Sequence, residues 1–469
     1  MDTLRWDQLK SNNQSHFVSP EVKSFRNDAI CLSNLISTSG WTFPSHASLF
    51  SGFLPYRHGA LNKRSKINPD VALFPQYLKK VDYATAGITD KGYVCAACGF
   101  GRGFDKFWQF QKGGRLKYFY TNYVPGLVEI SLFITQNFQN YPTQIQLRER
   151  YRKKIVSEKP YRRFHRNIRQ AEDWINTTRN SSDPFFLFLH SYEVHDYWKY
   201  YPEHYNRLKQ NHPDLYNALP PRGSRDHEEQ NWISPGESID PERIQALRTL
   251  YNYGAETVGN ELGKFFSYLK RKGLYRKSII VLLSDHGEAF SKSQKLFGHG
   301  DINDLLIRVP LYVKLPDNQG SDTSFHSQVQ ITDVFPMLFH YLGLNVNNPP
   351  YRSPAKDLLT KLVRGGQPSG RTVTRGEKTS NHNLFVRTEN YKMIFPPGDG
   401  EAQYFKVSKK FGSEVKIPAE DVPNDVKGIL VQSQKQYRNR LRKYATPDTG
   451  GAETMDPARK QDLKGLGYL

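Results

Sequence analysis

A hydroxyl group lies just ahead of a predicted helix in the stretch GWTFPSHASLFSG, residues 40–52. Pro44 suits the first helical turn, where no backbone donor is needed, and the helix is expected to end between Gly52 and Pro55. Thr42 therefore falls at or just before a helix N-terminus, where unpaired N–H groups and the helix dipole favour an anionic ester. The alternative is that Thr42 is an N-cap or loop residue without a chemical role.

Two acidic sites in the sequence could hold a cation beside this hydroxyl. Asp285 and His286 are adjacent in SDHGE, and Asp2 lies near the amino terminus. An oxygen and a nitrogen from adjacent residues can bind one cation. A cation held by Asp2, Asp285 and His286 would bind the Thr42 oxygen, lower its pKa and polarise a phosphoryl or sulfuryl oxygen. In isolation, an adjacent Asp-His pair is more often a hydrogen-bonded loop pair.

Short apolar runs that end in polar residues are expected to position these groups. Runs at residues 184–190, 278–288 and 308–316 are rich in Ile, Val, Leu and Phe without alternation, which is typical of strands covered on both faces. Residues 256–273 read as a helix that ends in basic residues and a glycine. Alternating strands and helices predict an α/β sandwich with a largely parallel central sheet flanked by helices.

The polar residues that end these runs mark the expected ligand site, because ligands of such sheets collect at the carboxyl ends of the strands. His190 and His195 follow the run at 184–190. Asp285, His286 and Glu288 end the next one.

The length of 469 residues predicts one large domain and a smaller one. We expect a catalytic domain over residues 1–345, with a basic insertion at about 110–170, and a carboxy-terminal subdomain over 346–469. The division rests on a change of composition near residue 345 and on the strand-like segment at 382–395.

A formal net charge of +20 favours anionic partners. Residues 148–169 hold ten Lys or Arg and only two acids. This segment is either a solvated helical face or a peripheral contact with an anionic membrane or polysaccharide. The apolar stretch at 127–134 either attaches to the membrane surface beside it or is an ordinary core segment. No nucleic-acid-reading motif accompanies it, so no specific nucleic acid is expected.

The sequence predicts no membrane span and no disulfide framework. No apolar run approaches the ~20 residues that a bilayer requires, and Met1 leads directly into DTLRWD without an apolar leader, so a cytoplasmic location is the default expectation. Of the three cysteines, Cys95 and Cys98 form VCAAC without a second Cys or His pair at zinc spacing. We expect two small buried thiols, with a redox or zinc site as the alternative.

Nine segments, in order along nearly the whole chain, resemble the sulfatase family of the alkaline phosphatase superfamily. They are DTLR, WTFPSHASLFSG, PYRHGA, FFLFLHSYEVH, LLSDHGE, GHG, IRVPLYVK, ITDVFPMLFHYLGL and LKGLGYL.

The resemblance implies a role for each matching position. Asp2 falls where the first metal-binding Asp lies, Asp285 and His286 fall on the second metal-binding pair, and Thr42 occupies the nucleophile position. Sulfatases have Cys or Ser there, which is oxidised to formylglycine. Threonine cannot form formylglycine, and relatives with threonine are phosphodiesterases, phosphoglycerol transferases and phosphomutases whose hydroxyl attacks phosphorus.

Three histidines complete the implied site. His195 matches the residue that contacts the substrate anion, and His299 in GHG matches the basic residue near the leaving group, the candidate general acid. His46 replaces the motif Arg and is expected to orient Thr42 or touch the anion. His58 and His190 are expected to be structural or to lie behind the site.

The sequence therefore predicts a metal-dependent hydrolase or transferase of sulfate or phosphate esters, with threonine favouring phosphoester or phosphodiester chemistry. One divalent cation is expected; manganese, zinc or iron suits the ligands better than calcium or magnesium, which remain alternatives. The alternatives are a sulfate-ester hydrolase that works without formylglycine and a non-catalytic relative that binds an anionic polymer or a membrane surface.

Overall fold

The computed structural model of the protein describes most of the chain. The described residues are 1–9, 16–17, 19–63, 65–90, 92–110, 163–178, 184–198, 201–220, 240–291, 296–344, 353–378, 381–407 and 414–444. Most of the basic insertion, including residues 127–134 and 148–162, and the final LKGLGYL lie outside these ranges.

The described strands of the larger part form two mixed sheets, one parallel sheet and one antiparallel hairpin. One has the order β11 (Ser324–Phe325), β1 (Ile30–Leu32), β10 (Leu311–Lys314), β6 (Ile280–Leu283). Others are β12 (Val329–Gln330), β2 (Leu35–Ile36), β9 (Arg308–Val309), then β4 (Lys106–Gln109), β3 (Ala84–Thr89), β5 (Phe185–Leu189), and the hairpin of β7 (Ala289–Ser291) and β8 (Leu296–Gly298). In the β4–β3–β5 sheet, β3 pairs in parallel with both neighbours. In the first sheet, β10 is antiparallel to both β1 and β6.

The sheets that contain β3 and β10 each separate two apolar cores, and β5 illustrates the reason. Phe185, Leu187 and Leu189 pack into one hydrophobic cluster, while the alternate residues Phe186 and Phe188 pack into the other. Because successive side chains of a strand point to opposite faces, an all-apolar strand needs cover on both sides. The unalternating apolar runs in the sequence are explained by this arrangement.

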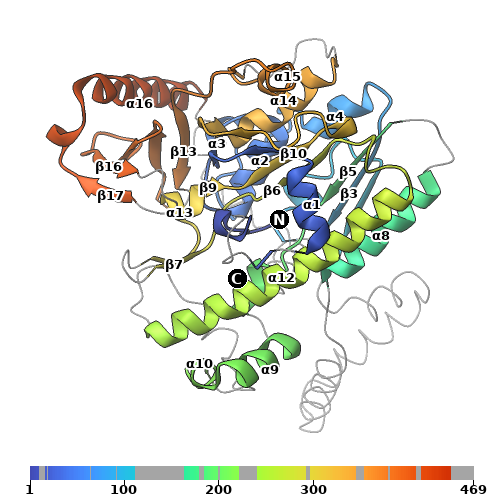
Figure 1. Cartoon of the computed structure of the whole chain (residues 1–469). Helices are drawn as coiled ribbons and strands as arrows, with labels where there is room; N and C mark the ends of the chain where they lie inside the picture. The colour runs from blue at the N-terminus through green and yellow to red at the C-terminus, as the bar shows by residue number, and fades with distance from the viewer. Residues whose placement is uncertain are drawn as a thin grey trace, which may run out of the picture.

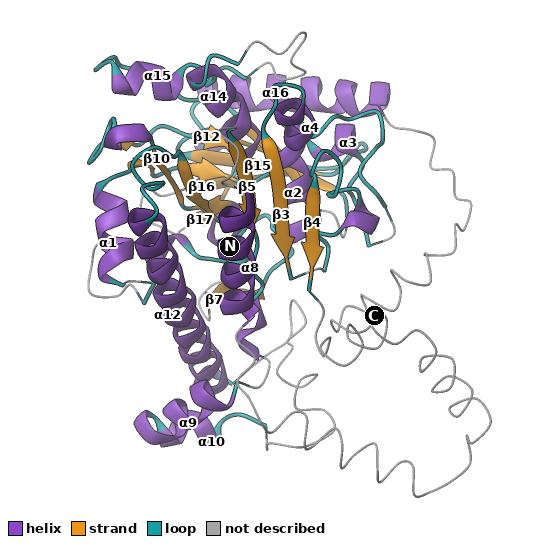
Figure 2. Ribbon diagram, turned by 90° about the vertical axis from the view of Figure 1, so that its right-hand side faces the viewer, coloured by secondary structure: helices purple, strands orange, loops and turns teal. Residues whose placement is uncertain are grey.

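Helices supply that cover on both faces (Figures 1 and 2). One group comprises α1 (Pro20–Asn27), α8 (Arg163–Thr178) and the long α12 (Pro241–Arg271), which contacts both of the others. The opposite group comprises α2 (Thr42–Ser51), α4 (Phe74–Lys79), α14 (Val334–Tyr341) and α15 (Leu358–Val363). Shorter helices are α3 (Pro55–His58), α9 (Pro202–Asn211), α10 (Pro213–Asn217) and α13 (Asp304–Ile307).

The predicted α/β class is confirmed; the β4–β3–β5 sheet is parallel, and the sheets that contain β1 and β2 are mixed. The run at 308–316 forms two strands separated by Pro310, because proline cannot donate to a ladder. The helix predicted at 256–273 begins earlier, at Pro241, where the Asp240 side chain accepts a hydrogen bond from Glu242 N.

A five-stranded antiparallel sheet follows the α/β part in the sequence. It contains β13 (Thr374–Lys378), β14 (Asn383–Arg387), β15 (Tyr391–Phe395), β16 (Gln403–Val407) and β17 (Glu414–Ile417) in sequence order. Helix α16 (Asn424–Tyr444) packs on β14 and β15 (Figure 1). The strand-like segment at 382–395 is thus the β14–β15 hairpin.

A buried ion pair and a buried lysine join this sheet to the α/β part. Asp304 receives two hydrogen bonds of 2.9 Å from Arg387, and both side chains are 1% exposed. Lys392 contacts Glu414 and donates to the carbonyl of Ile302 at 2.8 Å. Because a buried charge that loses its partner is costly, these contacts fix the sheet in one position.

One buried acid of the sheet makes stability depend on pH. Glu377 in β13 is 2% exposed, and its Oε1 accepts no hydrogen bond from any described residue. Burial raises the pKa of Glu377 to about 8. The carboxyl group is therefore protonated in the folded protein below about pH 8 but ionises in the unfolded chain above its ordinary pKa, so unfolding releases a proton and stability falls as pH rises through this interval.

We expect the Glu377→Gln variant to lose this pH dependence. Between pH 5 and pH 8 the wild type should lose roughly 3 to 5 kcal/mol of unfolding free energy relative to the variant. Urea denaturation at several pH values measures the difference. The exposed Glu420→Gln variant is the control and should parallel the wild type; parallel curves for Glu377→Gln would contradict the prediction.

No helix within the described ranges is both long and apolar enough to cross a membrane.

Candidate active site

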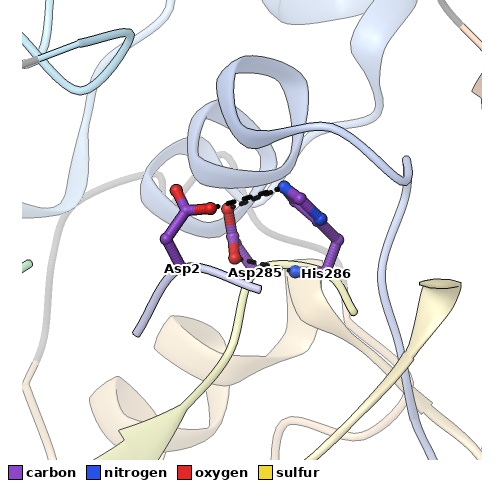
Figure 3. A group of neighbouring side chains, drawn as sticks. All are labelled: Asp2, Asp285 and His286. Atoms are coloured by element: carbon purple, nitrogen blue, oxygen red, sulfur yellow. Dashed lines mark hydrogen bonds and ion pairs between the residues drawn. The ribbon is translucent and has the colours of Figure 1, made fainter. Parts of the chain in front are cut away.

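Three side chains from distant parts of the chain meet in a buried cluster (Figure 3). Asp2, Asp285 and His286 each offer one ligand atom, and these atoms lie within 4.8 Å of one another. His286 Nε2 is 3.4 Å from Asp285 Oδ2 and 3.7 Å from Asp2 Oδ1. Across the described part of the chain, no other group of three or more His, Cys, Asp or Glu has this arrangement.

Backbone contacts with two strand ends hold the first ligand in place. Asp2 N donates to the carbonyl of Ser191, which follows β5, at 3.1 Å. Thr3 N donates at 3.2 Å to Oδ1 of Asp285, which follows β6. Asp2 is fully buried. The carboxyl ends of two strands thus position the cluster, as expected for an α/β sheet.

Thr42 lies beside this cluster, at the start of α2. The residue that precedes the helix is Trp41, and no side chain caps this N-terminus. The Thr42 hydroxyl is 3.2 Å from His286 Nε2 and fully buried. Its side chain therefore does not serve as an N-cap but faces the cluster of acids and imidazole.

Two buried oxygens show that the cluster fits a cation. Asp2 Oδ1 and Asp285 Oδ2 accept no hydrogen bond from any described residue. A buried, unsatisfied carboxylate oxygen is costly, and a bound cation removes that cost. Asp2, Asp285 and His286 would hold the ion, with the Thr42 oxygen adjacent. Two carboxylates and an imidazole suit a divalent ion such as manganese or zinc.

The two carboxyl groups also perturb one another. Burial, followed by the charge of Asp285, raises the pKa of Asp2 well above its usual value. Burial opposes ionisation of Asp285 as well, but the neighbouring His286 and His46 outweigh it and hold the pKa of Asp285 well below its usual value. Two acids that share a site cannot both ionise without a counter-charge, so a divalent cation held by Asp2 and Asp285 would supply the charge that a proton otherwise supplies.

His286 is prepared to act as a neutral ligand. Its Nδ1–H donates to the carbonyl of Gly287 at 2.9 Å, which leaves the Nε2 lone pair facing Thr42 and the acids. Burial lowers the pKa of His286 to about 4, so the ring is neutral at pH 7. This arrangement fixes both the tautomer and the orientation of the ring.

Two further imidazoles stand near the cluster, each paired with a carboxylate. His195 Nδ1 contacts Asp196 Oδ1 at 3.2 Å, and His299 Nδ1 contacts Glu288 Oε2 at 3.1 Å. The ring centroids of His195 and His299 are 4.9 Å apart, and those of His299 and His286 are 5.0 Å apart. A carboxylate at Nδ1 orients each ring and leaves Nε2 for other contacts.

Sequence reasoning gave no role to these two carboxylates. Asp196 directly follows His195, and Glu288 ends SDHGE, so an acid near a motif histidine was the available signal. The contact with His299 depends on the β7–β8 hairpin, which returns the chain to Glu288. Tyr197 donates a second hydrogen bond to Glu288, at 3.1 Å.

The remaining histidines lie at different distances from the cluster. His46 Nδ1 donates to the Thr42 carbonyl at 3.0 Å and lies 3.3 Å from Asp285 Oδ2, so it supports both residues. His190 Nε2 lies 3.3 Å from Asp2 Oδ2, behind the cluster. His58 instead contacts Ser48 at 2.9 Å. Every sequence-predicted site residue except His58, which we expected to be structural or to lie behind the site, therefore belongs to this cluster or to its immediate neighbours.

Comparison with known sequences gives the family. The sulfatase family model matches residues 1–344. Similar proteins include lipoteichoic acid synthase of Staphylococcus saprophyticus, 31% identical over 162 residues, which cover 32% of this chain and 24% of that protein. An arylsulfatase of Clostridium perfringens is 24% identical over 303 residues, covering 61% of this chain and 58% of that protein. The chain thus covers less than two thirds of the length of these relatives.

Solved structures agree on the fold. Phosphonate monoester hydrolase of Agrobacterium radiobacter superposes with a TM-score of 0.64 at 18% identity, over 94% of each chain. The corresponding hydrolase of Silicibacter pomeroyi gives 0.61 at 17% identity, also over 94% of each chain. Since the family match covers well over half of the chain and the fold agrees, the protein belongs to the sulfatase family.

Proposed function

We propose that the protein is a metal-dependent hydrolase or transferase of phosphate esters in which Thr42 is the nucleophile. The observation that carries this proposal is the position of the Thr42 hydroxyl, 3.2 Å from His286 Nε2 beside two buried carboxylates. Formylglycine cannot be made from threonine. The Thr42 hydroxyl, however, can attack phosphorus directly, without prior oxidation. A divalent cation, when bound, supplies Lewis acidity and lowers the pKa of an adjacent hydroxyl.

The side chains around Thr42 divide the remaining tasks. The hydroxyl of Thr42 attacks in line, and the N-terminus of α2 favours the anionic group beside it. His195, held by Asp196, binds the ester oxygens, and His299, held by Glu288, protonates the leaving oxygen. His46 fixes the backbone of Thr42 through its carbonyl.

The proposed substrate is an anionic ester, described by its chemical class. Among the relatives, lipoteichoic acid synthase is named for an anionic polymer and arylsulfatase for a sulfate ester. The net charge of +20 is consistent with action on an anionic polymer or at an anionic membrane surface. The second candidate is a sulfate-ester hydrolase that uses Thr42 directly, which the similarity to the arylsulfatase favours.

A panel of chromogenic substrates tests the proposal. Purified protein would be assayed with and without manganese on an aryl phosphate, an aryl phosphodiester, an aryl phosphonate monoester and an aryl sulfate. We expect metal-dependent turnover of a phosphorus ester, and faster turnover of the sulfate would establish the second candidate. Absence of turnover on every ester, with manganese binding demonstrated by calorimetry, would favour the non-catalytic alternative. A cytoplasmic location stays a prediction, to be checked by cell fractionation.

The Glu288→Gln variant tests the role of the His299 pair. Glutamine keeps the shape of the side chain but removes the charge that orients and stabilises the imidazole. We expect kcat to fall about 10- to 100-fold while the dissociation constant for manganese, measured by calorimetry, stays the same.

The matched variant Tyr197→Phe removes only the other hydrogen bond to Glu288 and should have a smaller effect. If Glu288→Gln kept the wild-type kcat, His299 would not depend on this carboxylate.

A further inference from the structure

The CAAC segment, residues 95–98, lies outside the candidate active site and brings two sulfurs close together. Cys95 precedes a short 3₁₀ helix, Ala96–Cys98, and the two sulfurs lie 3.0 Å apart. Cys95 has an extended backbone just before this helix and Cys98 is its last residue, so a single turn of chain brings the two sulfurs together. Both cysteines are in the thiol form in this structure. They are buried while Ala96 between them is exposed, so the loop is at the surface with its sulfurs turned inward.

The surroundings of this pair are unsuited to zinc. A structural zinc site needs four ligands from Cys, His or carboxylates. Within the described residues, the cluster of Asp2, Asp285 and His286 is the one group of three or more such residues. Cys95 and Cys98 instead pack among apolar side chains of the core that includes Phe43 and Phe100. The two sulfurs are therefore placed to bond to each other.

We propose that Cys95 and Cys98 form an intramolecular disulfide. The oxidant is a low-molecular-weight disulfide such as oxidised glutathione. Because both sulfurs are buried, the surface loop has to open before one cysteine thiolate can attack the oxidant to give a mixed disulfide and one glutathione thiol. The second cysteine thiolate then displaces the other glutathione. One S–S bond forms as one breaks, two electrons pass to glutathione, and the two cysteine protons end on the two glutathione thiols. The sulfurs need to approach by about 1 Å to reach disulfide bonding distance.

The disulfide would stabilise the loop that packs against the start of α2, the helix that begins at Thr42. The rings that flank the pair in sequence, Tyr93 and Phe100, contact the residues that flank Thr42. Trp41 and Tyr93 have centroids 4.8 Å apart, and Phe43 is 6.0 Å from both Tyr93 and Phe100. A covalent bond between Cys95 and Cys98 therefore limits how far these rings can move away from α2. The loop itself is anchored by Ile67 N, which donates to the Cys98 carbonyl at 3.1 Å.

Thiol counting on the full-length protein tests this proposal. The protein would be equilibrated with oxidised or reduced glutathione, quenched in acid, denatured, alkylated and weighed by mass spectrometry. We expect one alkylated cysteine, Cys31, in the oxidised sample and three in the reduced sample, with a Cys95–Cys98 cross-linked peptide. Three alkylated cysteines in the oxidised sample, a bond to Cys31, stable glutathione adducts, or zinc that protects the pair from alkylation would each overturn the proposal.

Variants separate the disulfide from a general effect on folding. Oxidised wild type should melt about 2 to 5 °C above reduced wild type. The Cys95→Ser/Cys98→Ser double variant should show no such difference and should match the circular dichroism of the reduced wild type. The control Cys31→Ser should keep the full shift, and loss of the shift in that variant would assign it to Cys31 instead.

Discussion

Replacing Thr42 with alanine is expected to lower kcat by at least about 10³-fold on whichever ester the wild type turns over. The reason is that alanine removes the atom that forms the covalent bond, while Asp2, Asp285 and His286 stay in place. Manganese affinity should therefore fall much less than kcat. Steady-state kinetics and calorimetry on the same preparation give both quantities.

The matched variant Thr42→Ser keeps the hydroxyl and removes only a methyl group. It should retain a measurable part of the activity, and rapid quenching of the wild type should trap a covalent adduct on the peptide that contains residue 42. Equal turnover by Thr42→Ala and wild type would remove the nucleophile assignment. A covalent adduct on another residue would also contradict it.

Replacing Asp285 with asparagine is expected to abolish both catalysis and the stabilisation of the fold by metal. The wild type should melt at a higher temperature with manganese than with a chelator, because a ligand at about 100 times its dissociation constant adds about 2.7 kcal/mol. In Asp285→Asn this increase should vanish, since the cluster loses a charged ligand. The metal-free variant should be less stable than the metal-free wild type, because the fold favours the charged form of Asp285, which asparagine cannot take.

The control for this experiment is Asp105→Asn, which alters a carboxylate that pairs with Lys79 well away from the cluster. It should show the full melting shift with manganese. Thermal unfolding with and without metal gives the result for all three proteins. A wild-type shift in Asp285→Asn would place the cation elsewhere.

The sequence pointed to the residues of the candidate site but not to their contacts, and the chemical roles of these residues stay predictions. Thr42, Asp285 and His286 were identified from their types and from the strand and helix ends that carry them. Their contacts could not be predicted, because they depend on how residues 240 or more positions apart are brought together. Glu288 was noted only as the end of a strand, since its contact with His299 requires a hairpin that no local pattern specified.

Fold prediction was limited by similar long-range effects. Apolar runs located β5, β6 and β10 correctly, because strands buried on both faces have a distinctive composition. The direction of β10, antiparallel to β6, was not predictable, since strand direction is determined by the connections between strands. The first turns of α12 were missed although Asp240 and Pro241 form a recognisable start.

The bond between Thr3 N and Asp285 spans 282 residues of sequence. At ordinary rates of translation, the ribosome takes on the order of 15 to 60 s to add that many residues. During that interval Asp2 is present without Asp285. A cation that needs both carboxylates can therefore bind only after Asp285 has been synthesised. The cluster of Asp2, Asp285 and His286 therefore forms only after residue 286 has been synthesised.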